Sequence, residues 1–456
     1  MIRFYNSLTN KIEEFKPIKE NTVMMYVCGS TVYNNMHIGN SRPIIFFDVV
    51  NRFFRYLNYD VFLVSNFTDI DDKIINKAKE QNVSESDVSE KYIREILETY
   101  VKLNCLPHYK NPKVTEHMDD IIEFIKELID KDGAYVTEGD VYFDVDKVED
   151  YGILSGQTKE NLISGARIEE NEKKKHSADF NLWKETKEGK KWKSPWSLGR
   201  PGWHTECVVM VNKIFKGKID IHGGGLDLKF PHHDNEIAQA KIAFKHNLAN
   251  YWMHNGRIDM SGEKMSKSLG NVIMADELVN RVGYPVYRLL ILNVPYRQPL
   301  NYKEELLVQV SKDYEKLSRS YLGLFRRMQI EFNVSDFNAI IQSEDLVELK
   351  NEFIEELSND FNTANAITVL FKVSKILNAL TRQKEINIEY AKEALLLYNE
   401  FAWVLGINTD VELLSEADLN LVRLWKEARD NKDFEKADLY REQINLKGIS
   451  LWILTC

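Results

Sequence analysis

The sequence predicts an α/β fold in which a parallel-sheet domain is interrupted by an insertion and followed by a helical domain. Three observations predict it. The first part of the chain alternates apolar, strand-like runs with segments of helical periodicity. A polar stretch rich in Lys and Trp, residues 169–199, breaks this alternation and reads as a loop-heavy insertion. From about residue 303 the pattern is almost entirely helical, with few Gly or Pro until the end.

The alternation begins with the apolar run NTVMMYVCG, residues 21–29, which is typical of a buried parallel strand. Residues 41–60, SRPIIFFDVVNRFFRYLNYD, follow with helical periodicity, and residues 61–69, VFLVSNFTD, follow with strand character. Strand, helix and strand over this length form a βαβ unit. After the insertion, KIDIHGGG at residues 218–225 resumes the pattern as another strand.

Two further elements are expected between these strands. Residues 115–133 have the periodicity of an amphipathic helix, with Thr115 as a possible N-cap and Gly133 as a possible C-cap. The short runs AYV and DVYFDV that follow predict a hairpin.

Length and composition limit the class of protein. A chain of 456 residues has room for two to four domains. Its formal charge of −10 means that any contact with nucleic acid must use local basic patches. No leader-like opening and no long apolar stretch is present, so we expect a soluble, cytoplasmic protein without a membrane contact. Four cysteines, Cys28, Cys105, Cys207 and Cys456, are too few for a disulfide scaffold.

The stretch FPHHDNE, Phe230 to Glu236, concentrates two histidines and two acids. Pro231 suits the first turn of a helix, and His232 and Glu236 would then share one face at a spacing of four. Two such ligands do not hold a zinc ion alone, so a metal site needs partners elsewhere in the chain. A catalytic base or a polar helix start with acids favoured by the helix dipole are alternative interpretations.

Two other stretches could bind a nucleotide. MHIGN, residues 36–40, lies between the first strand and the first helix, where phosphate is favoured. His37 could donate to phosphate oxygens, and Gly39 permits close approach of a base or ribose. HGGGLDL, residues 222–228, combines glycines with Asp227, which could accept ribose hydroxyl protons. Each pattern alone is also typical of an ordinary turn.

A third candidate is GEKMSKSLGN, residues 262–271, in which Lys264 and Lys267 stand among small residues. Paired lysines can neutralise the charge that develops on a pyrophosphate leaving group. The alternative interpretation is a solvated basic turn.

Together these motifs resemble those of the class I aminoacyl-tRNA synthetases, whose signatures are HIGH and KMSKS. Here they stand as HIGN at His37–Asn40 and as an intact KMSKS at Lys264–Ser268. Longer stretches resemble the cysteinyl-tRNA synthetase family, from the N-terminus to beyond residue 440: YVCGSTVYNNMHIGN, NFTDIDDKII, DFNLWK, SPWSLGRPGWHTEC, HGGGLDLKFPHHDNEIAQA and WMHNGRIDMSGEKMSKSLGN.

The resemblance implies a zinc ion held by Cys28, Cys207, His232 and Glu236. Zinc binds thiolate well and could capture the thiol of a cysteine substrate, whereas the hydroxyl of serine binds it poorly. The spacing alone would also allow His233 with Glu236, so the choice of His232 rests on the resemblance. The role of His233 stays open: it could support the site or the substrate, or cap the turn.

Other residues take roles by the same resemblance. The amino-acid site is expected to use Gly29, Thr31, Thr68 and Trp203. ATP is expected to contact His37, Gly39, Asn40, Asp227, Lys264 and Lys267. Of these, His37, Lys264 and Lys267 are the expected catalytic residues, and Mg²⁺ is expected to accompany ATP.

The implied architecture is a Rossmann-type catalytic domain with an insertion, an α-helical bundle and a small C-terminal tRNA-binding element. The expected partners are tRNA(Cys), ATP and L-cysteine, and the expected state is a monomer. The expected boundaries are 1–115 and 201–260 for the two halves of the catalytic domain, 116–200 for the insertion, 261–310 for the KMSKS loop and stem-contact region, 311–405 for the bundle and 406–456 for the terminal element.

Two departures from the family pattern accompany the resemblance. Asn40 replaces the second histidine of HIGH, so this position can hydrogen-bond to ATP but carries no positive charge. The terminal element is expected to be cut short after Leu451, which predicts weaker discrimination of the anticodon. Trp452 could replace a stacking surface there or close the last helices as a hydrophobic plug.

Two rival functions remain at this point. A ligase that joins cysteine to an amino-sugar shares the adenylation and zinc motifs but lacks a long helical region after KMSKS. A non-catalytic, synthetase-derived RNA-binding zinc protein would need neither an intact KMSKS nor a complete zinc set.

Overall fold

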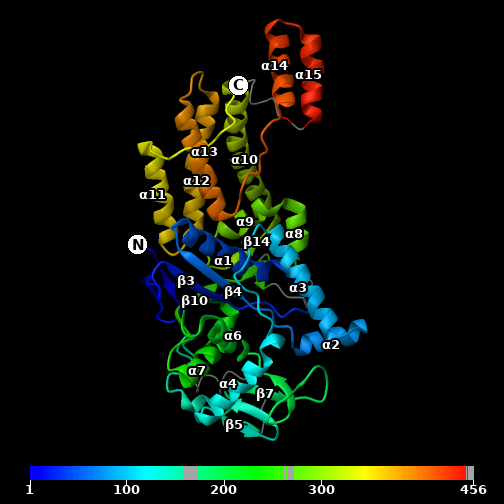
Figure 1. Ribbon diagram of the computed structural model, residues 1–456, viewed down its shortest axis with the longest axis vertical. Coiled ribbons are helices and arrows are strands. Elements are labelled where there is room, and N and C mark those ends of the chain that lie inside the picture. Colours follow the sequence, from blue (N-terminus) through cyan, green and yellow to red (C-terminus); the bar gives the residue numbers. More distant parts are fainter. Residues whose placement is uncertain (158–172, 261, 265–271, 448, 450–456) are drawn as a thin grey trace. The chain divides into compact units, whose positions relative to one another are not determined.

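The computed structural model describes the chain in two compact units. The first unit contains residues 1–283 and 296–302, and the second contains residues 284–295 and 303–456 (Figure 1). The described residues are 1–157, 173–260, 262–264, 272–447 and 449. Among the described helices, none combines the length and the apolar character that crossing a membrane requires.

A four-stranded parallel sheet forms the centre of the first unit, in the order β11–β10–β3–β4. Its strands are β3 (Thr22–Val27), β4 (Asp60–Ser65), β10 (Ile219–Gly225) and β11 (Ala249–Asn255). Helix α1 (Ile38–Tyr56) connects β3 to β4, so the βαβ unit expected from the sequence is present. A Cβ on Gly223 would lie only 2.0 Å from Cζ of Phe47, so the close packing of α1 on β10 requires glycine there.

Helices and small strands surround this sheet in Figure 1. The helices of the first unit are α2 (Asp72–Gln81), α3 (Glu85–Lys102), α4 (Met118–Asp130), α6 (Glu206–Phe215), α7 (Asp234–Phe244) and α8 (Ala275–Val282). The small strands are β1 (Arg3–Asn6) and β2 (Lys11–Glu14), which form a hairpin, and β12 (Ile258–Met260), β13 (Glu263–Lys264) and β14 (Leu300–Tyr302), which form a three-stranded sheet. Short helical turns cover Val114–His117, Val145–Lys147, Leu226–Leu228 and Lys229–His233.

The insertion is more regular than the sequence predicted. It forms a five-stranded antiparallel sheet in the order β5–β6–β7–β9–β8. Its strands are β5 (Ala134–Thr137), β6 (Asp140–Phe143), β7 (Phe180–Glu185), β8 (Trp192–Lys193) and β9 (Leu198–Pro201). The β5–β6 hairpin was expected, but the loop-heavy interpretation of residues 169–199 was wrong for β7 and β8. Trp183 is fully buried in a core shared with α4, α6 and α7, which explains the aromatic residues in this polar stretch.

The caps proposed for the helix over residues 115–133 were also wrong. Helix α4 begins at Met118, and Thr115 instead donates its hydroxyl and its backbone N–H to the carboxylate of Asp69. At the other end, Asp132 takes the left-handed conformation, with φ of 58°. The C-cap is Lys131, and Gly133, two positions later, donates its N–H to the carbonyl of Leu128.

The regular elements of the second unit are all helices within its described residues, as the sequence predicted. Its helices are α9 (Tyr284–Leu292), α10 (Glu304–Phe332), α11 (Glu344–Ser358), α12 (Thr363–Arg382), α13 (Ile388–Leu405), α14 (Glu416–Asp430) and α15 (Phe434–Leu446). In the bundle, Phe353 of α11 stacks on Phe401 of α13 with ring centroids 3.8 Å apart. Helices α14 and α15 form a hairpin around a small core of their own, which includes Trp425 and Ile444.

Candidate functional site

Four metal-ligating side chains meet where the carboxyl end of β3 faces α6 and α7. Cys28 directly follows β3, and Cys207 lies in the first turn of α6. His232 precedes α7, and Glu236 lies in the first turn of that helix. Their ligand atoms all lie within 4.8 Å of one another, so the structure brings together the four residues expected from the sequence.

The spacing of these atoms fits a tetrahedral ion. With Zn–S near 2.3 Å and Zn–N or Zn–O near 2.0 Å, tetrahedral edges are about 3.8 Å for S–S, about 3.5 Å for S–N or S–O and about 3.3 Å for N–O. The observed edges are 3.6 Å for Cys28 Sγ to Cys207 Sγ, 3.7 Å for Cys207 Sγ to His232 Nε2, 3.5 Å for Cys28 Sγ to Glu236 Oε1 and 2.9 Å for His232 Nε2 to Glu236 Oε1. The four donor atoms would need to move only slightly to coordinate one ion.

Neighbouring side chains orient the ligands. His232 has its Nδ1 3.0 Å from Nδ1 of His204, which leaves Nε2 directed at the cluster. Glu236 has its second oxygen, Oε2, 2.6 Å from Nε2 of His222. The ring of His222 stacks on Trp252 at 4.4 Å. Such outer contacts fix ring orientation at metal sites.

A second set of donors shares two members with the first: Cys28, His222, His233 and Glu236. It contains one thiol instead of two. Its histidines also have other contacts, because His233 Nδ1 lies 2.9 Å from His254 Nε2, and His254 Nδ1 lies 2.8 Å from Ser7 Oγ. The set with two sulfurs therefore suits zinc better. His233 packs beside the cluster, with Nε2 3.4 Å from Cys28 Sγ.

Without a metal, only two of the four ligands, Cys207 and Glu236, favour the deprotonated form. Burial opposes the charge of His232, but the nearby Glu236 raises the pKa of this imidazole to about 10. A hydrogen bond from Cys28 lowers the pKa of the Cys207 thiol to about 6, whereas burial raises the pKa of Cys28 well above its usual range. Burial opposes ionisation of Glu236, but the nearby His222 and His232 hold its pKa well below the ordinary value. Burial lowers the pKa of His204 to about 3, so this residue is neutral beside His232.

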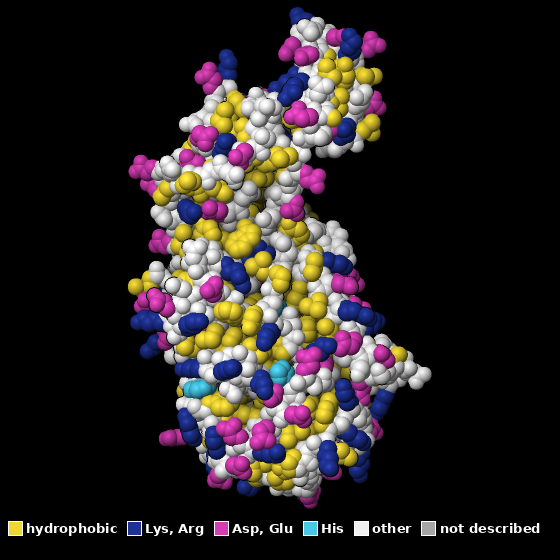
Figure 2. Space-filling view, in the orientation of Figure 1, with side chains coloured by type: hydrophobic (Ala, Val, Ile, Leu, Met, Phe, Trp, Pro, Cys, Tyr) yellow, Lys and Arg dark blue, Asp and Glu magenta, His cyan; other side chains and the backbone are white. Residues whose placement is uncertain are grey.

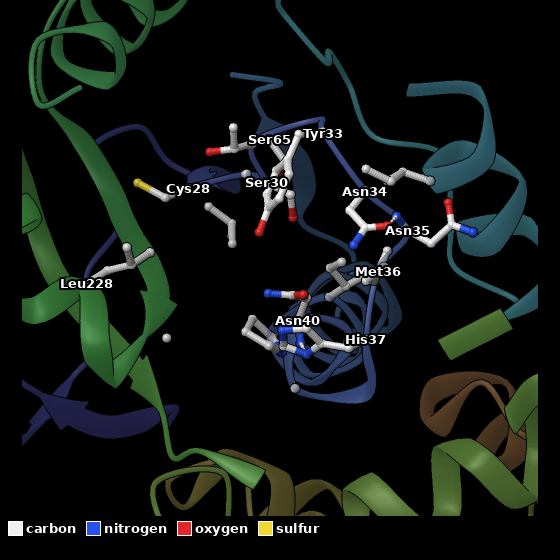
Figure 3. A pocket seen from close by; sticks show the side chains of 18 of the residues that line it. Cys28, Ser30, Tyr33, Asn34, Asn35, Met36, His37, Asn40, Ser65 and Leu228 are labelled. Atoms are coloured by element: carbon white, nitrogen blue, oxygen red, sulfur yellow. Dashed lines mark hydrogen bonds between the residues drawn. The ribbon is translucent and has the colours of Figure 1, made fainter. Parts of the chain in front are cut away.

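Cys28 also lies on the wall of a cavity of about 300 Å³ (Figure 3). The residues expected to bind substrate or ATP that line it are Gly29, Thr31, His37, Gly39, Asn40, Trp203 and Asp227. Trp203 stacks on His232 with centroids 4.4 Å apart and remains 43% exposed. The cavity therefore joins the thiol-rich end to the HIGN motif.

The HIGN motif forms the start of α1. His37 is the N-cap of α1, and its Nδ1 accepts a hydrogen bond of 3.3 Å from the N–H of Asn40. The first turn of α1 contains no acid, so the helix N-terminus that faces the cavity remains favourable for an anion. Backbone bonds from Ile38 to Ile273 and from Ala275 to Met36 join HIGN to the segment after KMSKS.

Three expected residues are not on the cavity wall or cannot be placed beside it. Thr68 is 3% exposed and lies behind Thr31, with which it forms a β-bridge. Lys264 ends strand β13, and Lys267 lies outside the described residues.

Sequence reasoning missed the buried polar residues behind the wall. Glu206 is 2% exposed and accepts a hydrogen bond of 3.0 Å from the hydroxyl of Thr68. Asn66 accepts a bond of 2.9 Å from the N–H of Gly29, and its amide lies 3.4 Å from Thr68 Oγ1. These contacts connect the loops that contain Cys28 to the helix that contains Cys207. The only signal in the sequence was that GWHTEC and NFTDIDD contain more polar residues than the zinc set uses.

Comparisons with known proteins identify the family of the chain. A family model described as the class I (C) tRNA synthetase catalytic domain matches residues 14–312, and the DALR domain matches residues 352–409. Cysteine–tRNA ligase of Halalkalibacterium halodurans is 44% identical over 99% of this chain and 97% of its own length. The chain belongs to the cysteine–tRNA ligase family. The family's enzyme from Acholeplasma laidlawii is likewise 44% identical, over 98% of this chain and 100% of its own.

Solved structures of more distant synthetases share the fold. A methionyl-tRNA synthetase of Mycobacterium tuberculosis, in complex with methionyl-adenylate, aligns with a TM-score of 0.62 at 14% identity, over 85% of this chain and 90% of that one. A putative arginyl-tRNA synthetase of Campylobacter jejuni aligns with a TM-score of 0.57 at 15% identity, over 88% and 95%. These alignments show that the chain has the α/β fold that the sequence predicted.

Proposed function

We propose that this protein activates L-cysteine with ATP, transfers it to the 3′ end of tRNA(Cys), and selects the substrate thiol with one zinc ion. The observation that carries this proposal is that Cys28 belongs both to the four-residue metal cluster and to the wall of the cavity that begins at HIGN. A metal site that could bind a thiol and a helix N-terminus that could bind phosphate thus lie on the same cavity.

Cys28, Cys207, His232 and Glu236 would hold the zinc, which supplies a Lewis acid that binds the substrate thiol as thiolate. Gly29 would form part of the wall beside the substrate, and loop packing requires glycine there, because a Cβ would lie 1.6 Å from the carbonyl oxygen of Asn66. The ring of Trp203, which already stacks on His232, would cover the substrate side chain. Serine would leave the metal without its preferred ligand, which is the basis of discrimination.

Activation needs positioning and charge stabilisation more than a general base. The ionised carboxylate of cysteine attacks the α-phosphorus of ATP, an oxygen–phosphorus bond forms, and the bond to the pyrophosphate oxygen breaks. The α1 N-terminus, His37 and Gly39 would hold the phosphates, Asn40 would donate a hydrogen bond, and Asp227 would accept from the ribose. Lys264 and Lys267, with Mg²⁺, would neutralise charge on the leaving pyrophosphate.

Transfer follows when a ribose hydroxyl of tRNA attacks the carbonyl carbon of the adenylate. The new ester bond forms, AMP leaves, and the hydroxyl proton passes to the leaving phosphate or to water. The DALR match in the second unit supports tRNA, and not an amino-sugar, as the acceptor, because the rival ligase lacks a long helical region there.

Two assays test the proposal. Cysteine-dependent exchange of pyrophosphate into ATP is expected, and it separates an enzyme from a binding protein. Formation of cysteinyl-tRNA(Cys) from the native transcript is expected as well, and it separates the synthetase from the sugar ligase. Absence of exchange in zinc-loaded protein would refute the activation step, and exchange without transfer to tRNA would favour the sugar ligase.

A further inference from the structure

One wall of the cavity is not used by the cysteine and ATP contacts described above. It is formed by the loop between β3 and α1 together with one side of α2 and α3. Its residues are Tyr33, Asn34, Asn35, Lys73, Ile96 and Tyr100. They combine aromatic rings, amides and a cation, a set that neither zinc binding nor the helix start at HIGN explains.

The side chains of this wall have a defined arrangement. Tyr33 projects toward the space between Cys28 and Asn40, and Asn34 and Asn35 lie on the side of α2 and α3 (Figure 3). The ammonium of Lys73 lies 5.4 Å from the centroid of the Tyr33 ring. An aromatic face with a cation beside it and amides along its edge suits a single-stranded nucleic acid, whose bases stack and whose phosphates need a positive partner.

The charge of Lys73 is not neutralised within the described part of the chain. It takes part in none of the ion pairs found there, although two acids precede it. Asp71 accepts the backbone N–H of Lys73 at 2.8 Å as the N-cap of α2, and Asp72 pairs with the buried Arg200. On the same helix, Lys77 pairs with Glu80 at 3.3 Å and does not reach the cavity.

The position of the wall matches what transfer requires. Tyr33 lies between Cys28, at the amino-acid end of the cavity, and Asn40, at its phosphate end (Figure 3). The carbonyl of the adenylate must lie between those ends. A nucleotide that enters along this wall would bring its ribose hydroxyl to that carbonyl.

We propose that Tyr33 and Lys73 form the binding site for the unpaired 3′ end of tRNA, with the Tyr33 ring stacking on a base and the Lys73 ammonium contacting a phosphate. This inference rests on the proposed function, since it concerns the second substrate of the same cavity. It assigns these two residues to transfer and not to activation.

The matched pair Lys73→Ala and Lys77→Ala tests the phosphate contact on the zinc-loaded, full-length enzyme. Both variants should keep the rate of cysteine-dependent pyrophosphate exchange and the KM for ATP. Lys73→Ala should weaken binding of the tRNA(Cys) transcript by roughly tenfold and reduce its salt slope by about one, whereas Lys77→Ala should change neither. A raised KM for ATP in Lys73→Ala would assign the lysine to the triphosphate and overturn the inference.

A transcript that lacks its unpaired 3′ nucleotides locates the contact. Its affinity should be the same for the wild type and for Lys73→Ala, because the contacted phosphate is gone. Equal weakening of the full and the shortened transcripts would place Lys73 on the stem and overturn the assignment. Loss of exchange in the wild-type enzyme would instead count against the proposed function itself, so the two failures are distinguishable.

The stacking role is tested by Tyr33→Phe and Tyr33→Ala in single-turnover transfer from preformed adenylate. Tyr33→Phe keeps the ring and should transfer at nearly the wild-type rate. Tyr33→Ala should transfer roughly tenfold more slowly at subsaturating tRNA, with exchange intact, as expected for one lost base–aromatic stack. Equal losses of exchange and transfer in Tyr33→Ala would show that the ring shapes the adenylate site and would refute the stacking role.

Discussion

The two ends of the cavity are built in opposite ways. At the thiol end, Cys207, His232 and Glu236 are at most 2% exposed, and each contacts a polar side chain from another segment of the chain. At the nucleotide end, Asn40 is exposed, and the wall consists of a helix start and glycine-rich turns. Cysteine and serine differ in a single side-chain atom, and a site that distinguishes them must be rigid. A charged nucleotide that must enter and leave calls for an open one.

The difference predicts where substitutions act. Changes at the thiol end should remove metal or cysteine binding, whereas changes at the nucleotide end should alter rates or the affinity for ATP and leave the metal in place. The predictions below test this division, beginning with the largest expected effect.

Cys207→Ser should remove zinc and abolish cysteine activation. Serine offers a hydroxyl that binds zinc far more weakly than thiolate, and the position of Cys207, at 2% exposure, is too deeply buried for water to replace the lost ligand easily. Elemental analysis should show less than one zinc per chain. The cysteine-dependent exchange of pyrophosphate into ATP should be absent. Cys105→Ser is the control, because Cys105 belongs to neither group of donors and should keep both zinc and activity. Full zinc content in Cys207→Ser would remove Cys207 from the site.

Lys267→Ala should leave zinc and cysteine binding unchanged but slow adenylate formation. If this lysine stabilises charge that develops only in the transition state, its loss should cost on the order of 3 kcal/mol, or about a hundredfold in rate. Pre-steady-state exchange, with cysteine affinity measured separately, provides the test. An unchanged rate would show that the KMSKS segment is only a basic turn.

Thr68→Val tests the buried hydrogen bonds between the loops around Cys28 and the helix that contains Cys207. Valine keeps the shape of threonine but leaves the carboxylate of Glu206 and the amide of Asn66 without the hydroxyl at 3.0 and 3.4 Å. Leaving such groups unpaired should lower the free energy of unfolding by about 1–3 kcal/mol. The variant should also lose zinc to a chelator faster than the wild type. Thr68→Ser should restore the wild-type rate of loss. Asp220→Asn alters another buried carboxylate, which accepts the backbone N–H groups of Ile18 and Met24 and belongs to neither set of donors, and should leave zinc retention unchanged.

The contrast between the two ends also explains what the sequence could predict. Three of the four parallel strands, β3, β4 and β10, follow from apolar character, and α1 follows from helical periodicity, whereas β11 was not predicted. The four candidate metal ligands follow from motifs that match a family. His204, His222 and Glu206 do not follow, because each acts on a partner 14 to 138 residues away that only the fold brings close. The insertion sheet was missed for a similar reason: β8 has two residues and β7 ends in charged ones, so neither shows a clear alternation.

Thr115 shows the same limit in a helix cap. It has the residue type and position of an N-cap, yet it bonds to Asp69, whose carboxylate lies 46 residues away in sequence. Local propensity predicts which groups need partners, while tertiary packing decides which partner each group finds.

Asn40→His, a substitution at the nucleotide end of the cavity, should have the smallest effect on the reaction. The residue lies in the first turn of α1, and its backbone N–H already bonds to His37, so the side chain can change without altering the cap. A neutral histidine should replace the amide with almost no change in ATP affinity. A protonated histidine would attract the phosphates of ATP but would be repelled by the positive end of the helix dipole, and each effect should be less than about 1 kcal/mol. Because an exposed histidine titrates at about pH 6.5, the variant should show a KM for ATP that changes by about threefold between pH 5.5 and 8. Asparagine does not titrate, so this additional step should be absent from the wild type, any pH dependence of ATP itself being common to both proteins. Zinc content should be the same in both. Superimposable profiles would mean that position 40 does not contact the phosphates, and HIGN would then bind ATP through His37, Gly39 and the helix start alone.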